Sequence, residues 1–234
     1  MKIKCPRDKN LKDPTECLAC CECYPPVLMK AIIKPNREKG KKEGKPRFGV
    51  GRLVKDCLRS AYYDLVEEIS YSPEKMWIFS RGEAIHAFFQ KGLDDKEKEI
   101  FVNVDFSAFQ LIGFIDALSG GILYEFKTVA DIPAYPQEHH ILQAQGYFSM
   151  LPPERQAEVE KILIVYASLK SIKSFEIPKR NILPFLEGRG TQLAIALLDN
   201  KAPAPTVGWL CDLCEFKELC ARDGIKMEQK KLVF

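Results

Sequence analysis

The chain has 234 residues, of which 46% are hydrophobic and 29% charged, and its formal net charge is +3. This length suffices for one sizeable core with a small appendage, and the slight basic excess permits nucleic-acid binding without requiring it. No apolar run approaches the roughly 20 residues that span a bilayer, and a signal-peptide pattern is lacking, so we expect a cytoplasmic protein without membrane contact.

The first 26 residues are rich in cysteine and hold almost no aliphatic side chains. Such a segment cannot bury a core of its own and needs a cross-link. The thiols at zinc-compatible spacing are Cys5, Cys17, Cys20 and Cys23, with Cys21 as a substitute or a spare. Because a reducing compartment leaves thiols free, we expect a zinc-binding appendage over residues 1–26. The alternative is a flexible or oxidisable arm.

A polar segment follows the cysteines. Residues 34–47 contain seven basic and two acidic residues and show no hydrophobic periodicity. We therefore expect a basic linker over residues 27–49. Its charge run is either a solvated face or a contact for DNA.

Two helices are predicted next. The first covers residues 50–69 and carries Cys57 in its apolar stripe, where a lone cysteine is ordinarily a small core residue. The second begins with a capping box at Ser80 and continues through Gly92. It carries His86 beside its apolar face, where a histidine is by itself more often a core residue than a ligand.

Strands dominate the middle of the chain. Apolar runs predict strands over 100–106, 110–118, 122–129, 162–168 and 174–177. Helical spacing predicts a helix after Pro136 through Met150 and another over residues 182–198. The alternating alanines and prolines of residues 202–205 indicate a stiff linker. We find no internal repeat.

One predicted hairpin gathers three charged residues. A Ser-Gly-Gly turn at 119–121 separates two apolar runs, as in a tight antiparallel hairpin. Asp116 lies in the first run, whereas Glu125 and Lys127 share one face of the second because their spacing is two. Burying such charges is costly unless a metal or a hydrogen-bonded partner compensates them.

The residue types in this hairpin suit a divalent metal centre. Magnesium and manganese prefer oxygen ligands, and two carboxylates with a strand carbonyl can supply them. Lys127 would then orient or deprotonate water, or stabilise a pentavalent phosphate. The alternative is a surface ion pair between Glu125 and Lys127, with Asp116 as a turn residue.

A second group of cysteines lies near the end of the chain. Cys211, Cys214 and Cys220 supply three thiolates in a compact segment, one fewer than a closed site needs. The fourth ligand must come from far away, and Cys57 is the isolated candidate. Zinc would fit such a set, but ligands so far apart in sequence favour an iron–sulfur cluster that joins both ends of the domain.

Motifs in residues 50–222 resemble those of RecB-type nucleases in the PD-(D/E)xK superfamily. In chain order they are Gly82-x-x-x-His86, Gly113-x-Ile115-Asp116, Glu125-x-Lys127 and Gln143-x-x-x-Tyr147. The cysteine layout resembles the iron–sulfur branch of these nucleases. The closest resemblance is to the CRISPR-associated RecB-like exonuclease family, the fourth of the numbered Cas families.

Two features depart from the pattern of that family. The family cysteine usually opens a Cys-Pro-Arg-x-x-Tyr-Tyr motif, whereas the residue after Cys57 is Leu58. The literal Cys-Pro-Arg at Cys5 lacks the tyrosines, so Cys57 is assigned to the cluster. The cysteine-rich N-terminus is also outside the usual pattern of the family.

The resemblance implies a role for each matching residue. It implies that His86, Asp116, Glu125 and the carbonyl of Phe126 bind magnesium or manganese. Lys127 would orient or activate the attacking water. Gln143 and Tyr147 would position the nucleic-acid strand, together with His140. The cluster, with 4Fe–4S favoured, would be held by Cys57, Cys211, Cys214 and Cys220 and would pin the C-terminal segment.

The resemblance also implies a fold and a domain layout. It implies an α/β protein with a restriction-endonuclease-like core, in which a mixed central sheet is flanked by helices, with an iron–sulfur clip and a small cysteine-rich appendage. The layout is an appendage (1–26), a linker (27–49), a nuclease domain (50–222) and a tail (223–234).

The implied activity is that of a metal-dependent DNA exonuclease acting on single-stranded DNA or overhangs. In the CRISPR context it would process DNA before capture as spacers, with integrase proteins as partners. A stand-alone RecB-like repair nuclease would use the same residues. A non-catalytic nucleic-acid-binding module is the alternative from another class, against which the complete set of candidate catalytic residues argues.

Overall fold

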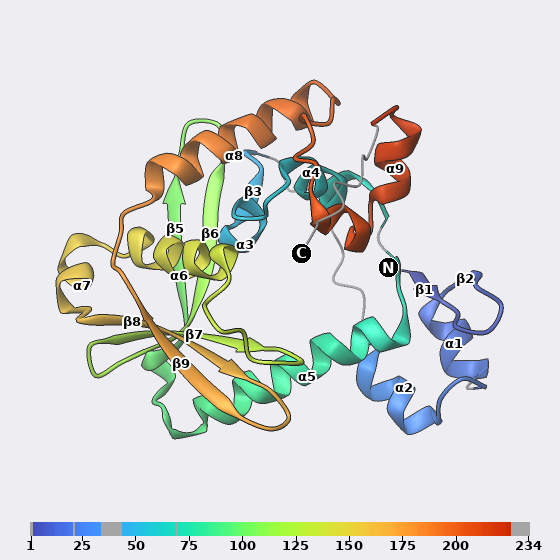
Figure 1. Cartoon of the computed structure of the whole chain (residues 1–234), viewed down its shortest axis with the longest axis horizontal. Coiled ribbons are helices and arrows are strands. Elements are labelled where there is room, and N and C mark those ends of the chain that lie inside the picture. Colours follow the sequence, from blue (N-terminus) through green and yellow to red (C-terminus); the bar gives the residue numbers. More distant parts are fainter. Residues whose placement is uncertain (1, 21, 34–43, 69, 226–234) are drawn as a thin grey trace.

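A mixed, six-stranded sheet forms the centre of the computed structural model, which describes residues 2–20, 22–33, 44–68 and 70–225 (Figure 1). Its strands are β3 (Arg47–Gly49), β5 (Lys98–Asp105), β6 (Gln110–Ser119), β7 (Ile122–Thr128), β8 (Lys161–Ala167) and β9 (Ile172–Ile177). The order is β3-β6-β7-β8-β9, and β5 pairs with β6 in addition. The long β6 pairs with β3 at its start and with β7 at its end, so it links both halves of the sheet.

The predicted hairpin is confirmed. β6 and β7 run antiparallel, and Ser119 pairs with Ile122 across the turn. Gly120 and Gly121 have φ angles of 57° and 76°. Consecutive positive φ angles suit a two-residue turn whose twist matches that of the strands, and glycine adopts them without steric cost.

Helix α6 (Glu138–Met150) connects β7 to the parallel strand β8. It packs on the sheet, and α8 (Leu183–Leu198) lies beyond it (Figure 1). Gly113 of β6 allows this approach, because a Cβ there would lie only 2.6 Å from the Tyr147 ring. Gly190 of α8 similarly lies against the buried ring of Phe109.

Helix α5 (Pro73–Phe89) lies on the other side of β7 from α6 (Figure 1). The predicted start at Ser80 is wrong. Ser72 caps the helix by accepting a hydrogen bond from the Lys75 N–H at 3.3 Å, and Pro73 occupies the first turn, where its missing N–H costs nothing. The ring of Phe89 near the end of α5 packs on Phe126 of β7 at 4.9 Å.

The predicted helix over residues 50–69 is also wrong, because the structure divides it into α3 (Val50–Leu53) and α4 (Leu58–Val66). Arg189 of α8 donates hydrogen bonds to the carbonyls of Leu53 and Lys55. The Arg189 side chain therefore satisfies carbonyls that would accept backbone hydrogen bonds if the helix were continuous. The break places Cys57 at the start of α4 in an extended conformation.

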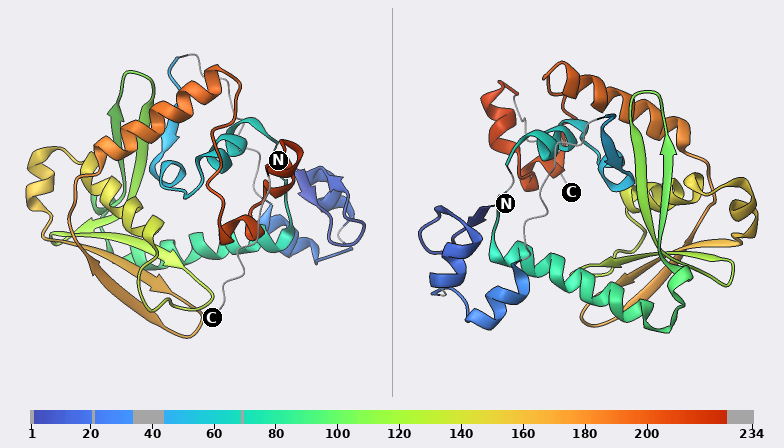
Figure 2. Two further views of the ribbon diagram at one scale, coloured as in Figure 1. Left: turned by 45° about the horizontal axis from the view of Figure 1, so that its top comes forward. Right: turned by 180° about the vertical axis from the view of Figure 1, so that it is seen from behind.

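The N-terminal residues form a small separate layer at the start of α5 (Figure 2). It contains β1 (Lys2–Lys4), β2 (Leu11–Lys12), α1 (Pro14–Cys20), α2 (Pro26–Ile32) and the pairing strand β4 (Ser70–Tyr71). The segment predicted as a linker, residues 27–49, begins within α2 and ends with β3. Residues 34–43 of this segment lie outside the described residues.

The remaining elements are short. They are α7 (Pro153–Glu158), α9 (Lys217–Arg222) and the 3-10 helices η1 (Gln90–Gly92), η2 (Asp95–Glu97) and η3 (Trp209–Leu213). Within the described residues, every helix is too short or too polar to cross a lipid bilayer.

Candidate active site

The hairpin brings its three charged residues to one place. Asp116 of β6 is 9% exposed, and Glu125 of β7 is 1% exposed. The backbone N–H of Phe126 donates to Asp116 Oδ2 at 2.7 Å, and Lys127 Nζ lies 2.6 Å from Glu125 Oε1. The contact between Glu125 and Lys127 is therefore an ion pair whose carboxylate is buried, and Asp116 is part of a strand rather than of the turn.

Helix α5 adds His86 to this group. Its Nδ1 lies 3.5 Å from Asp116 Oδ1. Burial opposes protonation of the imidazole, but the hydrogen bond and the charge of Asp116 outweigh it and raise the pKa of His86. Asp116 thus directs one oxygen to the backbone of β7 and the other to α5.

Glu99 is a fourth candidate that the sequence did not predict. His86, Glu99 and Asp116 each offer a ligand atom, and these atoms lie within 4.8 Å of one another. Gln90 positions Glu99 by donating to Glu99 Oε1 and to the Asp116 carbonyl, both at 2.8 Å. Glu99 has a φ angle of 48°, which is an unusual backbone conformation for glutamate. Neither this conformation nor the position of Glu99 beside Asp116 can be predicted from the local sequence.

These residues line an open cavity of about 850 Å³. Glu99, Asp116 and Lys127 reach it from the sheet, and Gly82 and His86 reach it from α5. The cavity therefore combines acidic, imidazole and ammonium groups on one surface.

The carboxylate of Glu125 is buried and incompletely satisfied. Burial raises its pKa to about 7, although the charge of Lys127 opposes the shift. Its Oε2 has no hydrogen-bond partner among the described residues. An unpaired buried carboxylate oxygen is costly, and a cation would compensate it. Among the described residues, the donors that lie close enough together to share a divalent metal are those of His86, Glu99 and Asp116, and Glu125 is not in that group.

A chain of hydrogen bonds leads from Lys127 to α6. Lys127 Nζ donates to Gln143 Oε1 at 3.0 Å, and Gln143 Nε2 donates to the Tyr147 hydroxyl at 2.9 Å. Burial raises the pKa of Tyr147 above its ordinary value, so the hydroxyl stays protonated at neutral pH. Gln143 and Tyr147, which are predicted to position the nucleic-acid strand, therefore also fix the position of Lys127.

His140 lies in the same helix but has a different partner. Its Nδ1 is 2.8 Å from the hydroxyl of Tyr166 in β8. Burial, assisted by the charge of Lys127, lowers the pKa of His140 to about 3. The imidazole is therefore neutral at physiological pH.

The four predicted cluster cysteines converge at the start of α4. The backbone N–H of Thr206 donates to Cys57 Sγ at 3.5 Å, and Cys211 Sγ lies 3.9 Å from the Thr206 carbonyl oxygen. Burial raises the pKa of Cys220, the neighbouring Arg59 opposes the shift, and Cys214 and Cys57 add smaller increases. The four thiols thus share one region, but no three of their sulfurs lie within 4.8 Å of one another among the described residues.

Other contacts hold the same C-terminal segment. Arg59 and Tyr63 of α4 both bond to the carboxylate of Asp223, and Arg59 also donates to the Pro203 carbonyl at 2.9 Å. The ring of Tyr63 packs on Phe216 at 5.7 Å. These side-chain contacts therefore hold the segment from Pro203 to Asp223 against α4.

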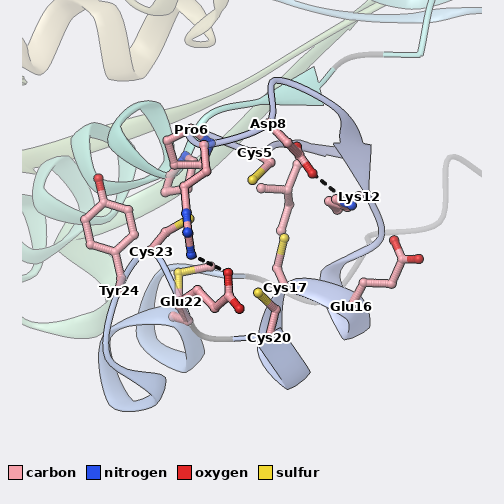
Figure 3. A pocket seen from close by; sticks show the side chains of 14 residues that line it. Cys5, Pro6, Asp8, Lys12, Glu16, Cys17, Cys20, Glu22, Cys23 and Tyr24 are labelled. Carbon is pink, nitrogen blue, oxygen red and sulfur yellow. Dashed lines mark hydrogen bonds and ion pairs between the residues drawn. The ribbon is translucent and has the colours of Figure 1, made fainter.

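The N-terminal cysteines line a separate cavity of about 550 Å³ (Figure 3). Burial raises the pKa of Cys17, and its three cysteine neighbours raise it further. The structure thus brings together all four thiols that the spacing singled out: Cys5, Cys17, Cys20 and Cys23.

Comparison with known proteins adds a fold likeness. No family model matches the chain, and no curated protein matches it. The crystal structure of SSO0001 aligns with a TM-score of 0.56 and 20% identity, over 83% of this chain and 94% of that chain. A structure titled as a putative exonuclease from Eubacterium rectale has a TM-score of 0.33 and 14% identity, over 67% of this chain and 61% of that chain. The first likeness shows a shared fold, and the second is too weak to carry an argument.

Proposed function

We propose that the protein is a metal-dependent nuclease that hydrolyses phosphodiester bonds of DNA, acting on single-stranded ends or overhangs. The observation that carries the proposal is the unpaired buried oxygen of Glu125 beside Lys127, Asp116 and His86. A structural ion pair needs neither a spare carboxylate oxygen nor an imidazole facing a cavity. Nuclease chemistry uses both.

Magnesium or manganese is the proposed cofactor. His86, Asp116 and Glu99 would hold it, as their ligand atoms lie within 4.8 Å of one another, and the motif resemblance adds Glu125 and the Phe126 carbonyl. A divalent cation bound there would polarise the phosphodiester and lower the pKa of the attacking water.

The chain's own residues supply the remaining functions. The Phe126 N–H holds one oxygen of Asp116, so the other is fixed in direction toward His86. Glu125 and Gln143 hold the Lys127 ammonium in place from two sides. A positive charge fixed before the reaction stabilises developing negative charge without reorganisation, and it also orients water by hydrogen bonding.

The rim of the cavity favours a single strand. Ile78 and Phe79 of α5 line it, and Phe79 is 42% exposed. The ammonium of Lys75 lies 5.6 Å from the centre of that ring. Lys75 also pairs with Glu215 at 3.3 Å, so it is the exposed ring of Phe79 that supports stacking of unpaired bases.

The cysteines around Thr206 are proposed to hold an iron–sulfur cluster, with 4Fe–4S favoured. Their placement between α4 and the C-terminal segment suits a structural clip. The biological context proposed from the motif resemblance is processing of DNA before its capture as CRISPR spacers, with integrase proteins as partners. A stand-alone repair nuclease would use the same site.

The decisive experiment incubates the anaerobically purified protein with end-labelled single-stranded and double-stranded DNA, with and without manganese. We expect manganese-dependent shortening from the ends of single strands, and cleavage by Asp116→Asn that is slower by about 100-fold or more. The length distribution over time reports polarity and separates exonuclease from endonuclease cleavage. Equal cleavage without a divalent metal, or by the variant, would refute the proposal.

The cluster has its own test. The purified protein should be brown, and Cys214→Ala should bleach it. A colourless protein that holds only zinc would disprove the cluster while leaving the nuclease proposal standing.

A further inference from the structure

The N-terminal layer has a very small core. Its cluster of buried apolar side chains consists of Ile3, Met29, Ile32 and Met76. Met76 belongs to α5, so the N-terminal residues contribute only part of this cluster. So little apolar burial does not offset the conformational entropy of ordering such a segment, and small domains of this kind ordinarily use disulfides or a metal.

The backbone brings the thiols together from separate elements. Cys5 follows β1 in a loop in which its N–H donates to the Asn10 carbonyl at 2.9 Å, and its carbonyl accepts from the Lys9 N–H at 3.1 Å. Cys17 and Cys20 lie one turn apart on α1, and Cys23 follows that helix. Figure 3 shows all four labelled cysteines around the same cavity.

The charged groups around this cavity already have partners. Asp8 pairs with Lys12 at 3.2 Å, and Glu22 pairs with Arg7. Glu16 accepts a hydrogen bond from the Asp13 N–H at 2.6 Å. The four thiols are therefore the donor set that the cavity offers, and soft sulfur ligands select zinc over magnesium or calcium.

We propose that Cys5, Cys17, Cys20 and Cys23 form a second, independent metal centre that binds one structural zinc ion. A set of four thiolates closes the tetrahedral shell of zinc and leaves no position open for catalysis. Zinc–sulfur bonds of about 2.3 Å place such thiolates about 3.8 Å apart. Among the described residues, no three of these sulfurs lie within 4.8 Å of one another. Zinc binding would therefore draw the cysteine side chains closer together.

The centre stabilises the start of the helix that carries His86. β1 pairs in parallel with β4, in the register Lys2 with Ser70 and Ile3 with Tyr71, immediately before α5. The Tyr24 hydroxyl, one residue after Cys23, donates to Glu74 in the first turn of α5. A metal that holds Cys23 and Cys5 together therefore supports both the pairing with β4 and the contact with the first turn of α5.

Elemental analysis of the full-length protein tests the proposal. We expect about one zinc per chain. Cys20→Ala and Cys23→Ala should each lose that zinc and keep any iron, whereas Cys214→Ala should keep the zinc. The contrast between the N-terminal variants and Cys214→Ala distinguishes loss of the zinc site from loss of the proposed iron–sulfur cluster. A protein without zinc, or variants that keep it, would overturn the proposal, and loss of iron instead would overturn the choice of metal.

A second measurement on the wild-type protein does not depend on how the Cys20→Ala and Cys23→Ala variants fold. Titration of the wild-type protein with a thiol-reactive mercurial, followed by a zinc-sensitive dye, should release zinc in proportion to thiols blocked. Cys21→Ala is the matched control, because it removes a neighbouring thiol outside the proposed set, and it should retain the zinc. Loss of zinc from this control would show that the ligand set is wrong.

Amide hydrogen exchange tests the link to the helix. Removal of zinc should increase exchange in β4 and in the first turn of α5, while the sheet around β7 keeps its protection. Unchanged exchange at the start of α5 would contradict the stabilising role.

Discussion

Asp116 Oδ2 accepts a hydrogen bond from the backbone N–H of Phe126 at 2.7 Å, while Asp116 Oδ1 lies 3.5 Å from His86 Nδ1. One carboxylate therefore joins adjacent strands and faces a helix at the same time. The hydrogen bond fixes its rotation, so the oxygen toward His86 is directed before any ligand binds.

Asp116→Asn separates these two functions. The side-chain oxygen of asparagine can still accept from Phe126, so we expect the fold to persist. The negative charge is lost, and manganese-dependent cleavage should fall by about 100-fold or more, the scale of removing one group that stabilises a transition state. Initial rates measure the loss, and circular dichroism with thermal melting measures the fold. A variant that cleaves normally would move the site elsewhere.

Glu125→Gln and Glu99→Gln distinguish the two ligand sets. We expect Glu125→Gln to weaken manganese binding more, because the Glu125 oxygen is buried and unpaired, whereas Glu99 has a partner in Gln90. Electron paramagnetic resonance of added manganese measures the affinity without requiring cleavage. If Glu99→Gln has the larger effect, the metal lies among His86, Glu99 and Asp116 instead.

Lys127→Met should lower turnover and leave manganese binding intact. The methionine is close in size but cannot orient water or stabilise negative charge, and Lys127 itself donates no metal ligand. We expect a loss of about 10²-fold in kcat with little change in KM. Steady-state kinetics and manganese binding are measured on the same preparation. A parallel loss of manganese would show that Lys127 instead supports the structure of the site.

Gly188 and Gly190 of α8 form a matched pair for stability. A Cβ at Gly190 would lie 2.0 Å from Phe109 Cζ, whereas nothing lies within 4 Å of a Cβ at Gly188. Gly190→Ala should destabilise by about 1–3 kcal/mol through overpacking. Gly188→Ala should stabilise by up to about 1 kcal/mol, because alanine favours the helix. Urea unfolding measures both, and equal effects would contradict the packing of α8.

The hydrogen bond of Tyr63 to Asp223 predicts a pH dependence at the alkaline end. Burial and the neighbouring Asp223 raise the pKa of Tyr63 to about 12. The folded value exceeds the ordinary value of about 10, so the contribution to stability is present below pH 10 and is lost as the pH rises toward 12. Tyrosinate absorbance, compared with that of Tyr63→Phe, should show one phenol titrating late. Its titration near pH 10 would show that the contact does not persist in solution.

Much of the hairpin could be predicted from local sequence. Two consecutive glycines between apolar runs determine a turn, and a spacing of two places Glu125 and Lys127 on one face of any strand. Both inferences depend on backbone geometry within a few residues. The boundaries of β6 and β7 therefore agree with the prediction to within one residue.

The break between α3 and α4 could not be predicted in that way. Arg189, more than 130 positions later, bonds to the carbonyls at the break, and no local pattern of residues 50–69 contains that contact. Glu99 joins His86 and Asp116 for a similar reason, since β5 pairs with β6 and α5 packs on β7. The sequence by itself determined which residue types occur, their spacing and the turn that joins them. Only the tertiary structure decided which of them meet, because contacts between distant segments depend on how the sheet and helices pack.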